Sequence, residues 1–204
     1  MQINDQELEV KFYVTDLNKI KSRLLALGAE ISQPRTYEVN LRFDKPDGEL
    51  VRTHQVLRLR RDSSVRLTYK GPGKTIDGIH LRKEIEFAAS DFDAAQAFLE
   101  ALGYQVQMIY EKYRMVYELE GVHVTLDEMP FGDFIELEGP DPEHIFNANQ
   151  SLELNWDARI LESYISLFDR LRIALNLSFR DLSFANFQHL AVKPEELNVI
   201  PGDI

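Results

Sequence analysis

The chain has 204 residues, of which 44% are hydrophobic and 28% are charged, and its formal net charge is −11. A chain of this length and composition is expected to form one globular domain, or one domain with an appendage. The acidic balance argues against broad nucleic-acid binding, which needs a basic surface. Because it has no cysteine, no run of about 18 apolar residues and a polar, acidic beginning, the sequence predicts a cytoplasmic protein without disulfides, targeting peptide or membrane partner.

Eight segments are predicted to be strands, because apolar and polar side chains alternate along them and give each strand one apolar and one charged face. In the first segment, Glu7, Glu9 and Lys11 share one face, and Leu8 and Val10 share the other. The eight segments are residues 7–12, 37–43, 56–60, 65–70, 79–87, 111–119, 122–128 and 134–138.

Two amphipathic helices are predicted between these strands. The first begins at Thr15 or Asp16 and ends at Gly28, and the second begins at residue 90 or 91 and ends at Gly103, because these residue types cap helix ends. Their apolar stripes consist of Leu17, Ile20, Leu24 and Leu27 in the first and Phe92, Ala95, Leu99 and Leu102 in the second. A third stripe, which would pack across one end of the strands, consists of Ile160, Tyr164, Leu167 or Phe168, and Leu171.

The chain contains an internal repeat. Residues 9–28 align with residues 84–103 without a gap, at a constant offset of 75 residues. A second gapless match pairs residues 67–72 with residues 135–140, and both of these pieces end in Gly-Pro. The repeat therefore predicts two β-α-β-β-β halves, and the glycines at 71 and 73 are expected to end the last strand of the first half.

Strands with one charged and one apolar face can be arranged in two ways. In an open sheet the charged face meets water, and the alternation is ordinary. In a closed sheet of eight strands the charged face lines an interior about wide enough for one small ligand. Charges of both signs would then have to be compensated by each other, by a metal or by a polyanion. The alternation alone is compatible with both arrangements.

Seven pieces of the chain follow one another in the order of a known family. They are ELEVK (7–11), VLRLRR (56–61), RLTYKGP (66–72), RKEIEF (82–87), EKYRMVYEL (111–119), VTLDEMPFG (124–132) and FIELEG (134–139). Together they resemble the CYTH family, or triphosphate tunnel metalloenzymes, which includes class IV adenylate cyclases, thiamine triphosphatases and inorganic triphosphatases. Residues 162–171 also resemble the helix that often follows the family's strands.

The resemblance implies an α+β fold: a closed eight-stranded antiparallel β-barrel, the triphosphate tunnel, with flanking helices and two pseudo-repeated halves. Residues 1–175 would form this domain, including its C-terminal helix, and residues 176–204 would form an extension. Within the extension, the aromatic-rich stretch 179–187 is expected to cover the barrel, with a dimer contact as the alternative. Residues 193–204 are expected to be extended or loosely ordered. A monomer and a homodimer both stay open.

The resemblance also implies roles for individual residues. The ligands of a divalent metal, Mg²⁺ or Mn²⁺, would be Glu7, Glu9, Asp127, Glu136 and Glu138. The cations that bind the triphosphate would be Lys11, Arg58, Arg60, Lys70, Arg82, Lys112 and Arg114. The catalytic side chains would be Lys11, Glu84 and Glu86. This division is physically reasonable, because carboxylates suit Mg²⁺ while Arg and Lys bind phosphoryl oxygens.

Three further residues stay outside this set. Arg66 faces inward by alternation but matches the family less securely. Arg42 lies in a segment, 37–43, that matches the family only loosely. His123 would share a face with Asp127 and is a weaker site candidate.

The implied function is metal-dependent hydrolysis of a small triphosphate, either tripolyphosphate or a nucleoside or thiamine triphosphate. The main rival is a class IV-type adenylate cyclase, in which the same cations hold ATP, its 3′ hydroxyl attacks the α-phosphorus, and cyclic AMP and pyrophosphate form. A rival of another class is a non-catalytic module that binds polyphosphate or nucleotide. The presence of acidic as well as basic positions disfavours this last alternative, because catalysis needs both.

Overall fold

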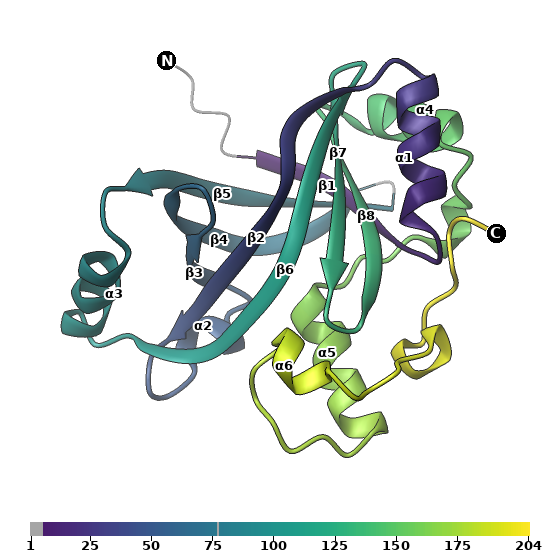
Figure 1. The fold of residues 1–204 in the computed structure, drawn as a ribbon. Coiled ribbons are helices and arrows are strands. Elements are labelled where there is room, and N and C mark those ends of the chain that lie inside the picture. Colours follow the sequence, from purple (N-terminus) through teal and green to yellow (C-terminus); the bar gives the residue numbers. More distant parts are fainter. Residues whose placement is uncertain (1–5, 77) are drawn as a thin grey trace.

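All eight predicted strands form in the structure, and each is antiparallel to its neighbours (Figure 1). The structure is a computed structural model that describes residues 6–76 and 78–204. The strands are β1 (Gln6–Val14), β2 (Glu30–Asp44), β3 (Val56–Arg61), β4 (Val65–Ile76), β5 (Ile79–Ala89), β6 (Gln105–Leu119), β7 (Val122–Met129) and β8 (Gly132–Glu138).

The sheet closes on itself. β1 pairs with β5 on one side and with β8 on the other, so the strand order β1-β5-β4-β3-β2-β6-β7-β8 returns to its start. Exchanging the first four strands for the last four reproduces the same cyclic order, which is the symmetry expected of two repeated β-α-β-β-β halves. Of the two arrangements that the alternation allows, the chain therefore adopts the closed ring.

The two predicted inter-strand helices are α1 (Leu17–Ala26) and α3 (Phe92–Ala101), and both begin at an aspartate. The Asp16 side chain accepts hydrogen bonds from two backbone amides of the first turn, and Asp91 accepts one. Each helix is followed by a glycine with positive φ, 77° at Gly28 and 85° at Gly103, a conformation that other residues rarely adopt. The last members of the two predicted stripes, at positions 27 and 102, are the C-caps and are exposed rather than packed.

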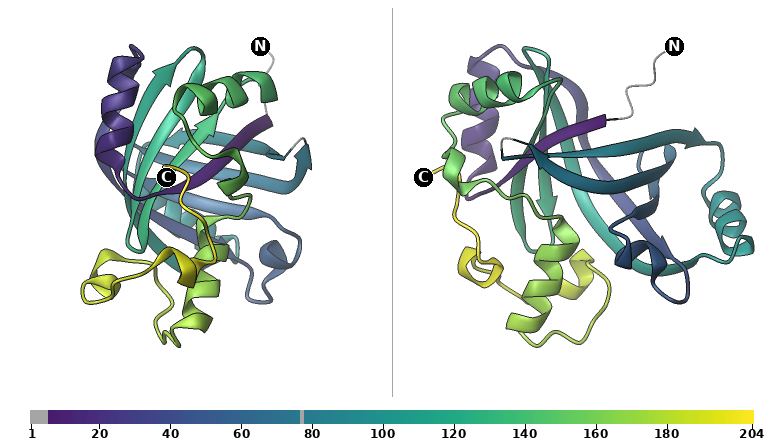
Figure 2. Two further views of the ribbon diagram at one scale, coloured as in Figure 1. Left: turned by 90° about the vertical axis from the view of Figure 1, so that its right-hand side faces the viewer. Right: turned by 180° about the vertical axis from the view of Figure 1, so that it is seen from behind.

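The main apolar core lies outside the ring. The outer faces of β1, β7 and β8 contribute Val10, Val124 and Leu137, which are almost fully buried with Ile20 of α1 and Ile145 of α4 (Pro142–Ser151). Figure 2 shows α1 and α4 beside these strands. With the apolar faces covered in this way, the charged faces look toward the middle of the ring.

A second apolar cluster lies under the predicted C-terminal helix. This helix, α5 (Tyr164–Ala174), buries Tyr164, Leu167, Phe168 and Leu171, whereas Ile160, the first position of the predicted stripe, is buried but precedes the helix. The other short helices are α2 (Glu49–Arg52), α6 (Phe184–Phe187) and two 3₁₀ turns, Trp156–Ala158 and Pro194–Leu197.

The C-terminal extension packs against the ring. Phe187 of α6 is buried against Phe131 and Phe168, so residues 179–187 take the covering role. The expectation of a loosely ordered end is wrong. Asp203 is buried, and its carboxylate accepts hydrogen bonds at 2.9–3.0 Å from the backbone amides of Thr15 and Asp16.

Three strands, β2, β4 and β6, extend well beyond the ranges that the alternation predicts. β2 and β6 pair with each other from Glu30 to Asp44, with register shifts, so backbone pairing continues where the side-chain pattern is irregular. β4 runs on to Ile76 through the glycines that were expected to end it, and a register shift between Lys70 and Gly73 accommodates the extra residues.

In the part of the chain that the structure describes, no helix has the length and apolarity needed to cross a bilayer.

Candidate functional site

The charged side chains inside the ring form three connected groups. The first, the β1–β5 group, joins Glu7 and Glu9 of β1 to Lys70 of β4 and to Arg82 and Glu84 of β5. Lys70 Nζ donates to both carboxylate oxygens of Glu7, at 2.6 and 2.7 Å, and lies 2.9 Å from Glu84 Oε2. Arg82 Nε donates to Glu7 Oε2 at 2.9 Å, and its Nη2 lies 3.5 Å from Glu9 Oε1.

The neighbouring cations and carboxylates decide which carboxylate of this group binds a proton more readily. Burial would raise the pKa of Glu7, but Lys70, the hydrogen bond with Glu84, and Arg82 outweigh it and hold the pKa far below its usual value. Burial raises the pKa of Glu84, and the negative charge of Glu7 adds to the rise. Glu7 is therefore the anion of the pair, while Glu84 is the carboxylate that accepts a proton more readily.

The carboxylates at this end of the ring are the best candidates for holding a cation. Glu138 of β8 lies opposite Glu9 in the register of β1 and β8. The equivalent pair in the other half is Glu84 and Lys70, which are of opposite charge. No ion pair of Glu138 is found among the described residues, and burial, together with Glu7 and Glu9, raises the pKa of Glu138 to about 7. A divalent cation would compensate the negative charge of these carboxylates, and their oxygens are the ligands that Mg²⁺ prefers.

The second group, the β3–β5 group, is centred on Glu86 of β5. Glu86 accepts a hydrogen bond of 2.7 Å from Thr68 Oγ1 and faces three guanidiniums, those of Arg60 and Arg66 at 3.3 Å and that of Arg58 at 3.4 Å. Burial would raise the pKa of Glu86, but Arg60, the Thr68 hydroxyl and Arg58 outweigh it and lower the pKa. Glu86 thus stays anionic and holds the arginines of β3 and β4 in one place.

The third group, the β6–β8 group, is centred on Asp127 of β7, which is fully buried. Arg114 donates to both of its oxygens, through Nε at 2.7 Å and Nη2 at 2.6 Å, and Lys112 Nζ donates at 2.9 Å. Arg114 Nη2 also donates to Glu136 Oε2 at 2.6 Å, and Lys11 Nζ lies 2.9 Å from Glu136 Oε1. The two carboxylates of this group are therefore already bound by cations.

The structure places the predicted site residues on the inner side of the ring, with Glu86 and Glu138 the most exposed of them, but it divides the five predicted metal ligands. Glu7, Glu9 and Glu138 lie at one end, while Asp127 and Glu136 belong to the β6–β8 group. Within residues 6–76 and 78–204, no three His, Asp or Glu side chains are arranged closely enough to hold a metal ion as they stand. The donor chemistry fits a divalent cation, and the carboxylates would have to rotate to complete its shell.

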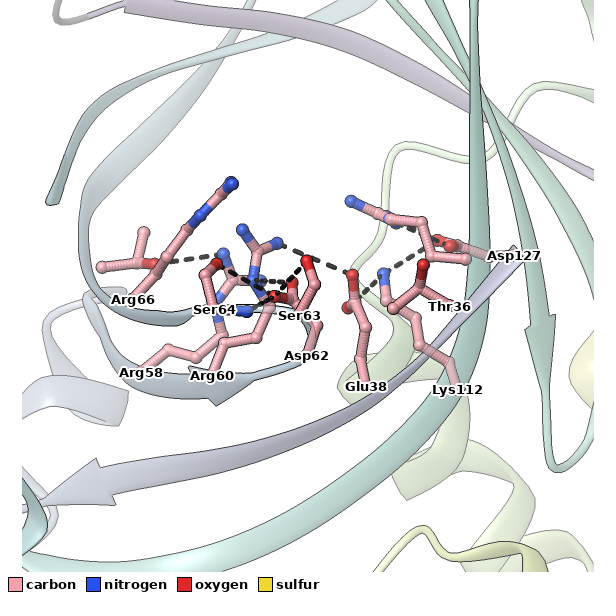
Figure 3. Close-up of polar contacts among 12 residues, drawn as sticks. Thr36, Glu38, Arg58, Arg60, Asp62, Ser63, Ser64, Arg66, Lys112 and Asp127 are labelled. Carbon is pink, nitrogen blue, oxygen red and sulfur yellow. Dashed lines mark hydrogen bonds and ion pairs between the residues drawn. The ribbon is translucent and has the colours of Figure 1, made fainter. Parts of the chain in front are cut away.

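Glu38 of β2 connects two of the groups and was missed in the sequence. Its carboxylate has no solvent exposure and lies 3.8 Å from both Arg60 Nη1 and Lys112 Nζ, too far for a hydrogen bond. Figure 3 shows Glu38 between the arginines of β3 and β4 on one side and Lys112 with Asp127 on the other. The available signal was the alternation Glu38, Asn40, Arg42, which places all three on the charged face of β2.

Tyr164 of α5 also belongs to the site, although a strand-based reading could not place it there. Its hydroxyl donates to Asp127 Oδ2 at 2.9 Å. The Nζ atoms of Lys11 and Lys112 lie 4.5 and 5.5 Å from the centre of its ring, within the range of cation–π contacts. The C-terminal helix therefore reaches the β6–β8 group with a polar side chain and does more than cover an end of the ring.

His123 lies at the edge of this arrangement. It is exposed, sits opposite Glu138 in the register of β7 and β8, and its Nε2 is 3.1 Å from Glu118 Oε1. The contact with Glu118 gives it a surface partner, so the geometry offers no specific role for His123 in the interior.

Known proteins with similar sequences or structures share this architecture. A model of the CYTH domain family matches residues 5–164. The adenylate cyclase CyaB of Aeromonas hydrophila is 29% identical over 136 residues, which are 64% of this chain and 67% of that protein. A solved structure from Vibrio parahaemolyticus has a TM-score of 0.73 at 22% identity and covers 82% of this chain and 99% of its own. A Hippeastrum protein reported to have a dominant triphosphatase activity has a TM-score of 0.63 at 20% identity, covering 80% and 95%.

Proposed function

The chain belongs to the CYTH domain family, and we propose that it is a divalent-metal-dependent hydrolase of small triphosphates. The observation that carries the proposal is the convergence of cations in an enclosed interior. Seven cations from five strands contribute to it, and neighbouring cations bind the same carboxylate. They are Lys11, Arg58, Arg60, Lys70, Arg82, Lys112 and Arg114. Such a surface fits a compact anion with several charges, which a triphosphate supplies.

The acidic end supports the metal dependence. Glu9 and Glu138, with Glu7 beside them, would hold Mg²⁺ or Mn²⁺, and a bound metal would neutralise charge on the phosphoryl oxygens. We assign Asp127 and Glu136 a different part from the one the resemblance implies. Because Arg114, Lys112 and Lys11 already bind them, they position these cations for the substrate.

Binding would exchange carboxylates for phosphoryl oxygens. Lys70 and Arg82, which contact Glu7 without a substrate, would turn to the triphosphate, and the planar guanidiniums of Arg58 and Arg60 would bind oxygens in pairs. Lys11, as a point charge, would stabilise the charge that develops on the transferred group. Glu84, the carboxylate with the raised pKa, and Glu86 are the side chains that could orient a water and take its proton.

Cyclic AMP formation is the second candidate, and one observation favours it. The relative CyaB of Aeromonas hydrophila, at 29% identity, is an adenylate cyclase. Both reactions use the same grip on the triphosphate, and they differ in whether water or the substrate's own 3′ hydroxyl attacks. We favour hydrolysis because a charged interior that holds a triphosphate and a water needs no further pocket for the base.

A product assay separates these reactions. Purified protein with Mg²⁺ or Mn²⁺ is given tripolyphosphate, ATP or thiamine triphosphate, and orthophosphate, pyrophosphate and cyclic AMP are quantified. Hydrolysis predicts orthophosphate from at least one substrate, without cyclic AMP. Cyclic AMP with pyrophosphate from ATP would replace the hydrolase by the cyclase. Binding without any product would indicate a non-catalytic module.

A further inference from the structure

The two halves of the internal repeat differ in what covers their outer strand faces. The constant offset of 75 residues equates Val10 and Phe12 of β1 with Ile85 and Phe87 of β5. Val10 and Phe12 belong to the main core, and Phe12 packs against the ring of Trp156. Their equivalents are on the surface, with Ile85 41% and Phe87 56% exposed. The same apolar pair is therefore core in one half and surface in the other.

The helices of the two halves differ in the same way. The offset equates Arg23 of α1 with Phe98 of α3, which is 62% exposed. Arg23 donates to the carbonyl of Leu152 and pairs with Glu153, so the polar side of α1 contacts the segment that follows α4. The corresponding side of α3 is an exposed apolar stripe, spaced by three and four residues, of Ala94, Ala97, Phe98, Ala101 and Leu102. A helix side that faces water is normally polar, so this stripe indicates a contact.

The exposed parts of β5 and α3 adjoin each other. Phe87 lies opposite Leu67 of β4, and Leu67 packs against the same apolar cluster as Phe92 and Ala95 of α3. Figures 1 and 2 show α3 on the other side of the ring from α1, α4 and the C-terminal end. We call the surface formed by Ile85, Phe87 and the exposed stripe of α3 the β5–α3 face. Exposed apolar patches of this kind mark interaction sites, because monomeric proteins rarely leave them in water.

The charges around the β5–α3 face differ between the two ends of α3. At the N-terminal end, Asp93 lies in the first turn and the guanidinium of Arg61 lies 4.5 Å from the ring centre of Phe92. At the C-terminal end, Glu100 is exposed and Lys45 Nζ donates to the C-cap carbonyl at 3.2 Å. Each end thus carries one acid and one base at the border of the apolar stripe.

This arrangement is complementary to itself when two copies of α3 lie antiparallel. The N-terminal end of one helix then meets the C-terminal end of the other, and the two helix dipoles oppose each other favourably. Asp93 of one copy falls beside Lys45 of the second copy. Arg61 falls beside Glu100 of the second copy. The alanines of the stripe leave room for the two helices to approach closely around Phe98.

We propose that the β5–α3 face is the contact of a twofold symmetric dimer, in which the α3 helices of two copies pack antiparallel. A twofold contact uses the same surface on both copies, which requires a self-complementary surface of this kind. The second copy would give Phe87 and Phe98 the apolar cover that the chain itself gives to β1 and α1. The inference is independent of the reaction that the ring catalyses.

Sedimentation velocity of the full chain measures the association. We expect a dimer for the unmodified chain and an association weakened by about a hundredfold or more for Phe98→Arg, as expected for loss of a central aromatic residue from an interface. The substitution introduces the residue type that α1 has at the equivalent position. Ile173→Arg is the matched control, because Ile173 of α5 is an even more exposed apolar residue outside the β5–α3 face, and it should leave the dimer unchanged. Circular dichroism confirms that both variants are folded.

Charge reversal tests the antiparallel arrangement. Asp93→Lys or Lys45→Glu alone places like charges beside each other in both symmetry-related contacts, so each variant should associate about tenfold more weakly. In an equimolar mixture of the two variants, the mixed dimer has opposite charges in both contacts. We expect this mixture to associate as tightly as the unmodified chain.

Three results would overturn the proposal. One is an unmodified chain that stays monomeric at about 100 µM, which would leave the β5–α3 face to a different protein. Another is a dimer that Phe98→Arg leaves intact, because its contact would then lie elsewhere, for example at residues 179–187. The third is a mixture of the two charge variants that associates no more tightly than either variant alone.

Discussion

At the scale of single residues, the charged side chains inside the ring hold one another in place. Asp127 shows this most clearly, because Arg114, Lys112 and Tyr164 all donate to it and no other contact is needed to keep it anionic. Burial would raise the pKa of Asp127, but Arg114 and Lys112 outweigh it and lower the pKa. An ion cluster satisfied in this way keeps lysine and arginine ordered, which the proposed binding of phosphoryl oxygens requires.

Removing the Tyr164 hydroxyl should loosen this cluster. Tyr164→Phe keeps the ring over Lys11 but deletes the hydrogen bond to Asp127, and we expect the free energy of unfolding to fall by about 1–2 kcal/mol and the rate of phosphate release to fall with it. Urea unfolding followed by circular dichroism, with a phosphate-release assay, measures both. Tyr117→Phe is the matched control, since Tyr117 is buried in the outer apolar core. Equal effects of the two substitutions would contradict the role given to Tyr164.

Asp133 of β8 gives a prediction for pH. Burial and the neighbouring charge of Glu128 raise the pKa of Asp133 from its ordinary value to about 6. A raised carboxyl pKa means that the folded state loses stability as pH rises from about 4 through 6, because the buried group must then ionise. Asp133→Asn should therefore increase the free energy of unfolding at pH 8 by up to about 1 kcal/mol, allowing for solvent screening, and leave it unchanged near pH 3.5. The measurement is the midpoint of urea unfolding of both proteins at the two pH values. An equal increase in stability at both pH values would contradict ionisation of Asp133 as its cause.

At the scale of elements, local patterns predicted the strands and the helix ends well. Alternation identified the central part of every strand, and the aspartate and glycine signals identified both ends of α1 and α3. These features depend on neighbouring residues alone. The extra length of β2 and β6 could not be read from the sequence, because it depends on their long pairing with each other.

The candidate site, like the strands, was predictable where it depends on local sequence patterns. Inward-facing charges on strands followed from alternation and resemblance, whereas the contact between Tyr164 and Asp127 joins a helix to a distant strand. No local pattern carries that information. The burial of Glu38 and Asn40 without a hydrogen-bond partner depends likewise on what the ring encloses.

The C-terminal segment stabilises the short connection between β1 and α1. Asp203 accepts hydrogen bonds from Thr15 and Asp16, and its backbone carbonyl accepts one from Lys19 Nζ at 2.9 Å. We expect Asp203→Ala to lower the free energy of unfolding by about 2–3 kcal/mol, because it leaves two backbone amides without their carboxylate acceptor. Asp157→Ala, at an exposed aspartate 3.7 Å from Arg159, is the control and should stay within about 0.5 kcal/mol of the original protein. Chemical unfolding of both variants is the measurement, and a negligible loss for Asp203→Ala would refute the anchoring role.

At the scale of the whole molecule, closure of the ring is what makes these charges a candidate site. The apolar faces of β1, β7 and β8 are covered by α1 and α4, so the charged faces have only the interior to face (Figure 2). An open sheet would have left the same residues in water, where exposed ion pairs contribute little. The fold, through strand order and helix cover, thus brings these charged side chains together on the inner side of one closed ring.

The central claim is that the carboxylates Glu7, Glu9 and Glu138 and the cations inside the ring act together to hydrolyse a triphosphate. The most direct test is the release of orthophosphate from tripolyphosphate in the presence of Mg²⁺ or Mn²⁺ by the unmodified chain and by Glu9→Ala, with circular dichroism to confirm that the variant is folded. We predict phosphate release by the unmodified chain and a loss of at least about a hundredfold in the folded variant. Phosphate release by folded Glu9→Ala at the unmodified rate would contradict the account.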